Sequence, residues 1–495
     1  MKKVLLISLN KEFENVQAGW PHLGLICVGT ALKNGGFEVL EVDYAFRKDA
    51  PTIQSFCKQF NPDIIGFSLY TSTWERYDKL LNELPHFTNA IIMVGGAHAS
   101  INYEELSGDN RIDYIVTGEV EEGICDICQN ATKHIMPEVI HCGYIDTKHL
   151  PLADFSIAYQ HEEIVERGVQ LSRGCPYNCS FCQIRLIASR KVRYRVIDDC
   201  IAEIESQLNI MPKLRVVRVI DDCPSFNIKL FKEFIRRFID KFPQLSINIQ
   251  HLRADQIDEE AADLLKQAHV QSVTIGVESA NPTVYEHIQK AETLEEIERG
   301  CRLVKRKGIC LYLAFIVGLP LSNYERERDS LQFAKSIKAN HVYWNMLIPY
   351  KGSRAYEWMQ EHGKVYRDKA GTTLMDNNLQ FDEPCVETSD FSIQDRERAQ
   401  VRAVLETKAF PFRLKLIPRI FQLACEFNLW TSVYHLFFNW HNIKNIIGDM
   451  VDGYIIAKFA PTLATKLEGN KTGRFIKGIL KGMIRTKSKL LGGVS

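Results

Sequence analysis

Short apolar runs alternate with amphipathic stretches along the first part of the chain. The apolar runs predict strands at residues 4–9, 38–42, 64–69, 91–94 and 114–116. The stretches between them, such as 25–33 and 74–81, carry apolar residues on one face at helical spacing. Apolar strands separated by helices are typical of a parallel sheet covered on both faces. The pattern therefore predicts an α/β domain over residues 1–145.

A second series of alternating elements follows. Strands are predicted at residues 169–171, 216–220, 247–250, 273–275, 312–317 and 342–347, with helices around 196–208, 228–240, 258–268, 293–307 and 324–338. Six βα repeats with short loops favour a partial TIM barrel, (β/α)6, over residues 160–375, with its chemistry on the loops after the strands. Residues 141–154 mark the boundary between the two domains. From about residue 392 the pattern changes to aromatic-rich helices, which predicts a helical C-terminal region over 385–495.

Composition limits the classes of protein that fit this chain. With 495 residues, 45% of them hydrophobic, the chain has ordinary globular usage, which excludes a disordered or fibrous protein. The 61 basic and 61 acidic side chains give no net charge, so we expect no nucleic acid partner. The first apolar run is too short for a signal peptide, and no apolar run is long enough to span a membrane. We therefore expect a cytoplasmic protein, in which 14 cysteines indicate thiolate chemistry or burial instead of disulfides.

The carboxyl ends of the strands in the first domain carry candidate binding residues. Ligands of parallel sheets bind at this edge. The residues found there are Ser68 and Tyr70, then Gly95, Gly96 and His98, then Gly118 and Glu119. Adjacent glycines either let a ligand approach the backbone closely or make a tight turn.

Three cysteines, Cys175, Cys179 and Cys182, follow directly on the first predicted strand of the second domain. They lie in a loop rich in Gly, Pro, Asn and Ser, so their sulfurs can converge at the barrel mouth. Three thiolates are one fewer than a closed structural zinc site needs. A cubane iron–sulfur cluster held by three cysteines leaves one iron open to an outside ligand. The cluster is the favoured interpretation, and a zinc site is the alternative.

This cysteine loop, with Phe181 before the third cysteine, resembles the signature of the radical S-adenosylmethionine superfamily. Residues 274–279, 317–320 and 349–353 agree with later segments of that family in order and spacing. The resemblance implies that the three cysteines bind a [4Fe–4S] cluster and that S-adenosylmethionine chelates its open iron. It also makes Asp221, Asp222 and Glu278 candidates for polar contacts with the nucleoside or amino group of S-adenosylmethionine.

The first domain, in combination with this barrel, resembles the Rossmann-like (flavodoxin-like) cobalamin-binding domain of one class in the superfamily. The resemblance rests on Gly24 and Leu25 and on segments 66–68, 94–98 and 117–119. It implies that the strand-end residues named above contact cobalamin. The sequence Asp-x-His-x-x-Gly, which supplies a cobalt ligand in other corrinoid proteins, does not follow the first strand, so we expect no protein histidine on cobalt. His22 is interpreted as a loop or surface histidine.

Cys125 and Cys128, with Cys142 nearby, allow two interpretations. Their C-x2-C spacing suits a second metal site. Alternatively, a helix that starts at residues 118–122 places Cys125 and Cys128 on one face, buried against the sheet. Burial is the favoured interpretation.

Residues 471–490 hold seven Lys or Arg, no acid, and apolar residues at helical spacing. Such a basic amphipathic helix either associates with an anionic membrane surface or docks its apolar stripe on the protein. The first interpretation would place the protein peripherally at the inner membrane surface and would fit a lipid-like substrate. The sequence leaves both interpretations open.

With the resemblance, these features predict a cobalamin-dependent radical S-adenosylmethionine enzyme that methylates an unactivated carbon of a small or lipid-like molecule. It would use the [4Fe–4S] cluster, S-adenosylmethionine and methylcobalamin, with a one-electron reductant such as flavodoxin or ferredoxin. Two alternatives stay open: a radical cyclase or rearrangement enzyme, and a non-catalytic iron–sulfur or corrinoid sensor. The segments 278–279 and 318–320 disfavour the sensor, because sensing needs only the cluster.

Overall fold

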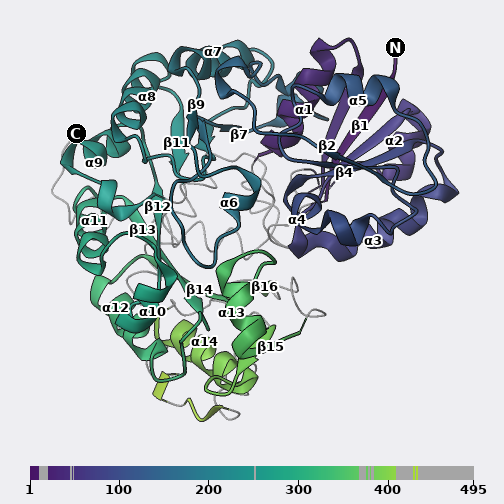
Figure 1. Cartoon of the computed structure of the whole chain (residues 1–495). Helices are drawn as coiled ribbons and strands as arrows, with labels where there is room; N and C mark the ends of the chain where they lie inside the picture. Colours follow the sequence, from purple (N-terminus) through teal and green to yellow (C-terminus); the bar gives the residue numbers. More distant parts are fainter. Residues whose placement is uncertain are drawn as a thin grey trace, which may run out of the picture. The chain divides into compact units, whose positions relative to one another are not determined.

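The computed structural model describes residues 1–9, 20–44, 47, 49–249, 252–366, 375–376, 379–380, 384–407, 427–429 and 431–432. The chain forms two compact units, Met1–Gln400 and Val401–Ser495. The first unit contains both large sheets and the site, and its elements are labelled in Figure 1. In the second unit, the described residues are the end of α14 (Ile393–Thr407) and two short pieces beyond it.

The first domain is built on six parallel strands. They are β1 (Lys3–Ser8), β2 (Glu38–Asp43), β3 (Ile64–Ser68), β4 (Ile91–Gly95), β5 (Tyr114–Thr117) and β6 (Glu138–His141). Their order across the sheet is β2-β1-β3-β4-β5-β6. The five predicted strands are confirmed. The sequence pattern misses β6 because this edge strand has only half-buried and exposed residues and therefore no continuous apolar run.

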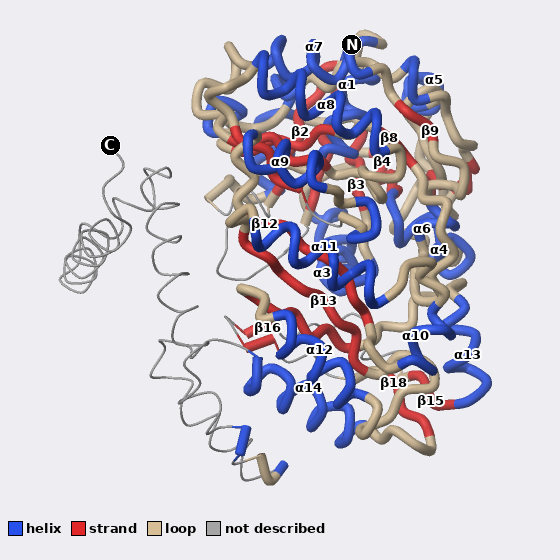
Figure 2. Tube along the Cα trace, turned by 90° about the vertical axis from the view of Figure 1, so that its left-hand side faces the viewer, coloured by secondary structure: helices blue, strands red, loops and turns tan. Residues whose placement is uncertain are grey.

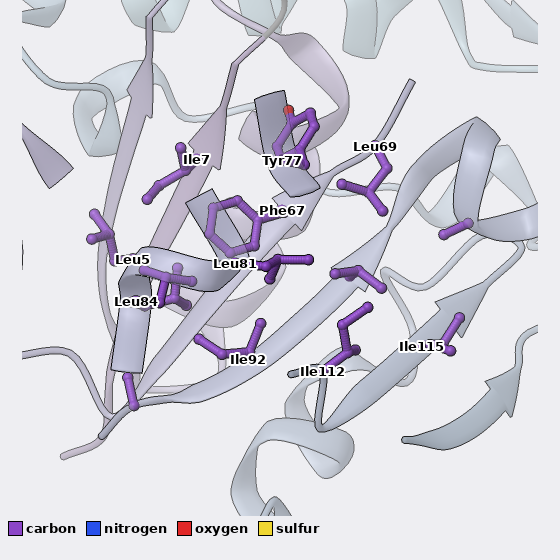
Figure 3. Packing of buried hydrophobic residues seen from close by; sticks show 14 of the residues in the cluster. Leu5, Ile7, Phe67, Leu69, Tyr77, Leu81, Leu84, Ile92, Ile112 and Ile115 are labelled. Carbon is purple, nitrogen blue, oxygen red and sulfur yellow. The ribbon is translucent and has the colours of Figure 1, made fainter. Parts of the chain in front are cut away.

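Helices cover both faces of this sheet, as predicted. On one face pack α1 (Leu23–Asn34) and α5 (Ile124–Asn130). On the other pack α2 (Ile53–Phe60), α3 (Trp74–Glu83) and α4 (Gly96–Leu106). Figure 3 shows this second core, in which Leu5 and Ile7 of β1 lie with Phe67 of β3 and with Tyr77 and Leu81 of α3. With both faces buried, the open edge at the strands' carboxyl ends is left for ligands.

The second domain is an open barrel of six parallel strands. They are β7 (Glu166–Val169), β10 (Val216–Val219), β11 (Ser246–Ile249), β12 (Ser272–Glu278), β13 (Cys310–Val317) and β14 (His341–Met346). The helices that follow the strands are α7 (Ile197–Gln207), α8 (Ile228–Lys241), α9 (Glu259–Gln267), α11 (Leu294–Arg306) and α12 (Glu327–Ile337). The spatial order β14-β13-β12-β11-β10-β7 follows the chain, and β7 and β14 are the two edges. In Figure 2, α11 lies beside β12 and β13, which it contacts, and α12 contacts β13. The predicted partial barrel is confirmed.

The first barrel strand differs from its prediction at residues 169–171 and lies three residues earlier, at Glu166–Val169. The apolar pattern hides this start because Arg167 stands inside the strand. Arg167 is fully buried, stacks on the Phe155 ring at 4.4 Å and forms an ion pair with Glu203 of α7. A charged residue is tolerated in a core strand when its charge is paired.

Shorter elements connect these layers. They are β8 (Ser172–Arg173), β9 (Arg193–Tyr194), β15 (Gly363–Val365), β16 (Met375–Asp376), β17 (Leu379–Gln380), β18 (Val386–Thr388), α6 (Ile184–Ile187), α10 (Pro282–Ile288), α13 (Arg354–His362) and the short 3-10 helices η1 (Thr71–Thr73), η2 (Leu84–His86), η3 (Thr147–His149), η4 (Phe155–Ile157), η5 (His161–Glu163) and η6 (Ala254–Gln256). The predicted helical region 385–495 is described only in part, and the basic segment 471–490 lies outside the described residues. Among the helices described, none is long and apolar enough to cross a membrane.

The segment between the two sheets is fastened to both domains. On the side of the first domain, Lys33 Nζ of α1 lies 2.6 Å from Asp154 Oδ2. On the barrel side, the Ala153 N–H donates to Glu203 Oε2 at 2.9 Å, and the Phe155 N–H donates to Gln207 Oε1 at 2.9 Å. These contacts tie α1 to α7 and hold the domains together.

Candidate functional site

A cavity of about 750 Å³ lies between the carboxyl ends of the first sheet and the first two strands of the barrel. It brings together seven of the predicted site residues: Ser68, Tyr70, Gly95, Gly96, Gly118, Glu119 and Asp222. The barrel contributes Gln170, Arg173 and Arg218 to the same wall. The two domains predicted from the sequence therefore line one common cavity.

Two turns at the cavity require glycine, both because of their positive φ and because a Cβ would clash with neighbouring atoms. Gly96 has φ of 89°, and a Cβ there would lie 2.8 Å from Ser68 Oγ. Gly118 has φ of 82°, and a Cβ there would lie 2.1 Å from the Cys142 carbonyl oxygen. These clashes support the tight-turn interpretation at Gly96 and require glycine at Gly118 as well, whereas close approach of a ligand stays a prediction.

His98 is placed differently from the other predicted residues. It is buried within α4, outside the cavity lining. Its Nδ1 lies 3.0 Å from Thr71 Oγ1 and 3.1 Å from Asn102 Nδ2, and its ring stacks on Trp74. His98 therefore packs α4 against α3, and its contact with cobalamin stays a prediction without support from these partners.

Glu119 and Glu121 pair with arginines of the barrel. Arg193 Nη1 lies 2.6 Å from Glu119 Oε2, and Arg173 Nη2 lies 2.5 Å from Glu121 Oε1. The predicted helix start at residues 118–122 is wrong: α5 begins at Ile124, because both acids are held in the turn by these partners. Glu119 still lines the cavity, but its carboxylate is already engaged.

His22 lies in the loop before α1, as predicted, but it lines the cavity and is not a surface residue. It is the N-cap of α1, and its Nδ1 accepts from the Leu25 N–H at 3.0 Å. Its Nε2 lies 2.9 Å from Tyr70 Oη. Both ring nitrogens are therefore engaged within the chain, which agrees with the expectation that no protein histidine ligates cobalt.

Burial of His22 and His98 should make the stability of the protein depend on pH. Burial lowers the pKa of both His22 and His98 from 6.5 to about 4. Between these values the unfolded chain binds protons that the folded chain does not, so the free energy of unfolding should decrease as pH falls from 6.5 toward 4. The substitution His98→Gln should make this decrease shallower, which urea unfolding at about pH 7 and about pH 5 would measure. Parallel pH profiles for wild type and variant would contradict the assignment.

The cysteine loop begins after β8 and is held on several sides. The Cys175 N–H donates to the Ser189 carbonyl at 3.2 Å, and the Ser180 N–H donates to the Ile288 carbonyl at 2.9 Å. The Ala355 N–H donates to the Ser180 carbonyl at 2.8 Å, which joins the loop to the segment after β14. These bonds fix the backbone, so the three thiols are presented by a rigid frame.

The three thiols of the loop are half-buried. Burial raises the pKa of Cys179 to about 12 and that of Cys182 to about 11, whereas a hydrogen bond with Cys223 lowers the pKa of Cys175 to about 7. In the part of the chain that the structure describes, no group of three or more His, Cys, Asp or Glu side chains is placed to hold one metal ion. A four-iron cluster binds each cysteine to a different iron, so it does not need three sulfurs around one point.

Two of the predicted S-adenosylmethionine contacts lie at the end of β10. Both oxygens of Asp221 are used inside the barrel, because they accept from the Leu171 N–H at 2.8 Å and from the Ser172 hydroxyl at 2.6 Å. Burial raises its pKa to about 7. Asp222 accepts from the Gly174 N–H at 3.0 Å and faces the cavity. Asp221 is thus a structural link, whereas Asp222 remains the better placed of the two for a ligand.

Glu278 lies in a β-bulge at the end of β12 with φ of 68°. Its Oε1 is 3.5 Å from Lys290 Nζ, which also lies 2.9 Å from Glu292 Oε1. Burial raises the pKa of Glu278, while the ammonium of Lys290 acts in the opposite direction. A left-handed conformation at a non-glycine residue is unfavourable and often marks a functional position. The role predicted for Glu278 at S-adenosylmethionine stays a prediction.

Cys125, Cys128 and Cys142 fit the burial interpretation better than a second metal site. Cys128 is buried in the core between α5 and the sheet. The Cys125 thiol donates to the Ala31 carbonyl at 3.3 Å. These three residues are half-buried or buried packing side chains, and among the described residues they belong to no group of three side chains that could hold a metal ion.

Two family models match this chain. Residues 13–127 match the B12 binding domain, and residues 169–334 match the Radical SAM superfamily. An uncharacterized methyltransferase of Pyrococcus horikoshii is 23% identical over 333 residues, which cover 62% of this chain and 71% of that protein. The anaerobic magnesium-protoporphyrin IX monomethyl ester cyclase of Rubrivivax gelatinosus is 24% identical over 388 residues, which cover 71% of this chain and 68% of that protein.

The fold also resembles a solved structure. That structure is the radical S-adenosylmethionine methyltransferase TsrM from Kitasatospora setae with tryptophan substrate and a S-adenosylmethionine analog bound. The TM-score is 0.59 at 18% identity, and the match covers 88% of this chain and 89% of that chain. At this identity the likeness concerns the fold, and it confirms the predicted combination of a Rossmann-like domain with a partial barrel.

Proposed function

Because the chain belongs to the radical S-adenosylmethionine superfamily and carries a B12-binding domain before the barrel, we propose that it methylates an unactivated carbon of a small or lipid-like molecule. The observation that carries this proposal is the shared cavity. Its walls come from the strand ends of the B12-binding domain and from the barrel beside the cysteine loop. A methyl donor and a substrate radical must meet in one space, and the cavity shared by the two domains offers such a space.

The chain is an enzyme of this superfamily, with a [4Fe–4S] cluster, S-adenosylmethionine and cobalamin as its cofactors. The sensor alternative is therefore not retained. Three half-buried thiols on a fixed backbone fit a cluster with one open iron, and Cys175, Cys179 and Cys182 would hold it. The glycine turns at Gly96 and Gly118 fit close approach of a large ring system to the first domain.

When bound, the cluster and S-adenosylmethionine supply a radical that takes hydrogen from carbon, and cobalamin supplies the methyl group. The residues of the chain bind and orient the cofactors and the substrate, and they exclude water from the site. Asp222 and Glu278 lie at strand ends where they would contact polar groups of S-adenosylmethionine. Arg173 and Arg193, paired with acids of the first domain, close the junction between the two domains and so limit entry of water.

The cofactors need an outside electron donor, and a flavodoxin or ferredoxin remains part of the proposal. Arg190 and Lys191 are exposed next to the cysteine loop. The Arg190 guanidinium donates to the Pro176 carbonyl at 3.3 Å, directly beside Cys175. A basic surface so close to the cluster ligands suits an electron-transfer protein with an acidic surface.

The products of S-adenosylmethionine test the reaction type. Full-length protein, reconstituted without oxygen and loaded with hydroxocobalamin, is incubated with methyl-deuterated S-adenosylmethionine, a reductant, and an extract of lipids and porphyrins. Methyl transfer predicts 5′-deoxyadenosine and S-adenosylhomocysteine in about equal amounts, with the label in a component of the extract. Failure of both nucleoside products to form would contradict the proposal.

One relative supports a second candidate function. The similarity to a magnesium-protoporphyrin cyclase extends over 71% of this chain, so a radical cyclisation or rearrangement is the alternative. That reaction predicts 5′-deoxyadenosine without S-adenosylhomocysteine and no label in the extract. The same incubation therefore separates the two functions.

A further inference from the structure

Arg218, on β10, lines the cavity and carries one donor without a partner among the described residues. Its side chain is only 7% exposed. Its Nε donates to Glu166 Oε1 at 2.7 Å, and its guanidinium stacks on the Trp20 ring at 3.6 Å. Its Nη1 is buried and has no hydrogen-bond partner among the residues that the structure describes. One edge and one face of the guanidinium are thus fixed, while its Nη1 is left without an acceptor.

A guanidinium that is held in place but has one unpaired nitrogen is suited to bind a ligand. A buried guanidinium nitrogen without a partner is unfavourable, and native proteins seldom leave one. The ion pair with Glu166 and the stacking on Trp20 hold the planar group in one orientation. Because this orientation is set before binding, little conformational entropy is lost when an acceptor arrives.

The charges of the cavity indicate what kind of acceptor fits. Four acids and two arginines line it: Asp43, Glu119, Glu121, Asp222, Arg173 and Arg218. Both arginines already face a carboxylate, since Arg173 pairs with Glu121 and Arg218 pairs with Glu166. An anionic ligand would add to an excess of negative charge in a partly buried space. An uncharged carbonyl oxygen would accept the hydrogen bond without that repulsion.

We propose that Arg218 binds an uncharged amide oxygen on the edge of the corrin ring of cobalamin, so that the barrel as well as the first domain holds this cofactor. The inference rests on the proposed function, because it assumes that cobalamin occupies the shared cavity. Arg218 belongs to the barrel and stacks on Trp20 of the first domain. A bond from Arg218 to cobalamin would therefore place the cofactor at a point where the two domains already touch.

Cobalamin binding to the full-length protein tests this contact. Equilibrium dialysis against hydroxocobalamin should show binding to Arg218→Lys weakened by about tenfold or more, because a hydrogen bond to a charged donor is lost. Arg218→Met should show at least the same loss. The matched control is Arg111→Lys, a half-buried and ion-paired arginine of the first domain away from the cavity, which should keep wild-type affinity. Iron content after reconstitution should be unchanged in all three variants.

Cobinamide separates the corrin amides from the nucleotide tail. It lacks the nucleotide and its phosphate but keeps the amide side chains, so Arg218→Lys should weaken cobinamide binding by the same factor as cobalamin binding. A loss seen with cobalamin alone would assign the donor to the anionic tail and overturn the inference, and so would wild-type affinity in both Arg218 variants. If wild-type protein binds neither corrinoid, the cobalamin-dependent function itself fails. Normal binding by wild type with an unaffected variant leaves that function standing and removes only the role of Arg218.

Discussion

Replacing Cys182 with alanine is expected to abolish the iron–sulfur cluster and, with it, all cleavage of S-adenosylmethionine. Wild-type protein reconstituted without oxygen should hold about four irons per chain, and the variant should hold close to none. The reason is that only three thiols in this loop are offered to the cluster, so losing one leaves two ligands for four irons. Iron and sulfide analysis, with the visible absorbance before and after dithionite, measures the effect.

The control for this prediction is another buried cysteine near the same strands. Cys200 lies on α7, is fully buried, and its thiol faces the Gln170 carbonyl at 3.7 Å. Cys200→Ala should keep full cluster content because this thiol belongs to the packing of the barrel. A Cys182→Ala variant with four irons and wild-type formation of 5′-deoxyadenosine would overturn the ligand assignment.

The sequence predicts the fold well wherever burial is continuous. Strand β3 is buried at every position and β13 at alternate positions, and both are mostly apolar, which identifies them as strands. Prediction fails where a polar residue is buried by pairing: Arg167 hides the start of β7, and its partner Glu203 is 36 residues away. A pattern read along the chain contains no information about such a distant pair.

In the site, too, features that are local in sequence can be predicted, and pairs of distant residues cannot. The cysteine loop and the strand-end glycines can be predicted because their chemistry is local in sequence. Glu119 is also at a strand end, yet its carboxylate is paired with Arg193, 74 residues later. His22 escapes prediction because its partner Tyr70 is 48 residues away in the same domain, and Arg218 escapes it because Trp20 belongs to the other domain. Histidine is not among the usual N-cap residues, so the sequence before α1 gives no N-cap signal at this position.

Replacing Glu203 with alanine is expected to lower the free energy of unfolding by about 3–5 kcal/mol, because the partners of a buried ion pair are left without compensation. The Glu203 carboxylate is 1% exposed and pairs with Arg167 and with Arg195, whose Nη2 lies 2.7 Å away. It also accepts the Ala153 N–H of the segment between the domains. Two buried guanidinium groups and one backbone donor would therefore lose their acceptor together. Urea unfolding of the reconstituted protein measures the change.

The same helix offers a matched control. Glu205 lies two residues further along α7, is about half exposed, and pairs with Lys241 at 2.8 Å. Glu205→Ala should change the free energy of unfolding by less than about 1 kcal/mol, since exposed ion pairs contribute little. Equal effects of the two substitutions would show that the buried carboxylate is not what joins the domains. A large effect of Glu203→Ala alone, accompanied by weaker cobalamin binding, would indicate that this link keeps the two walls of the shared cavity in place.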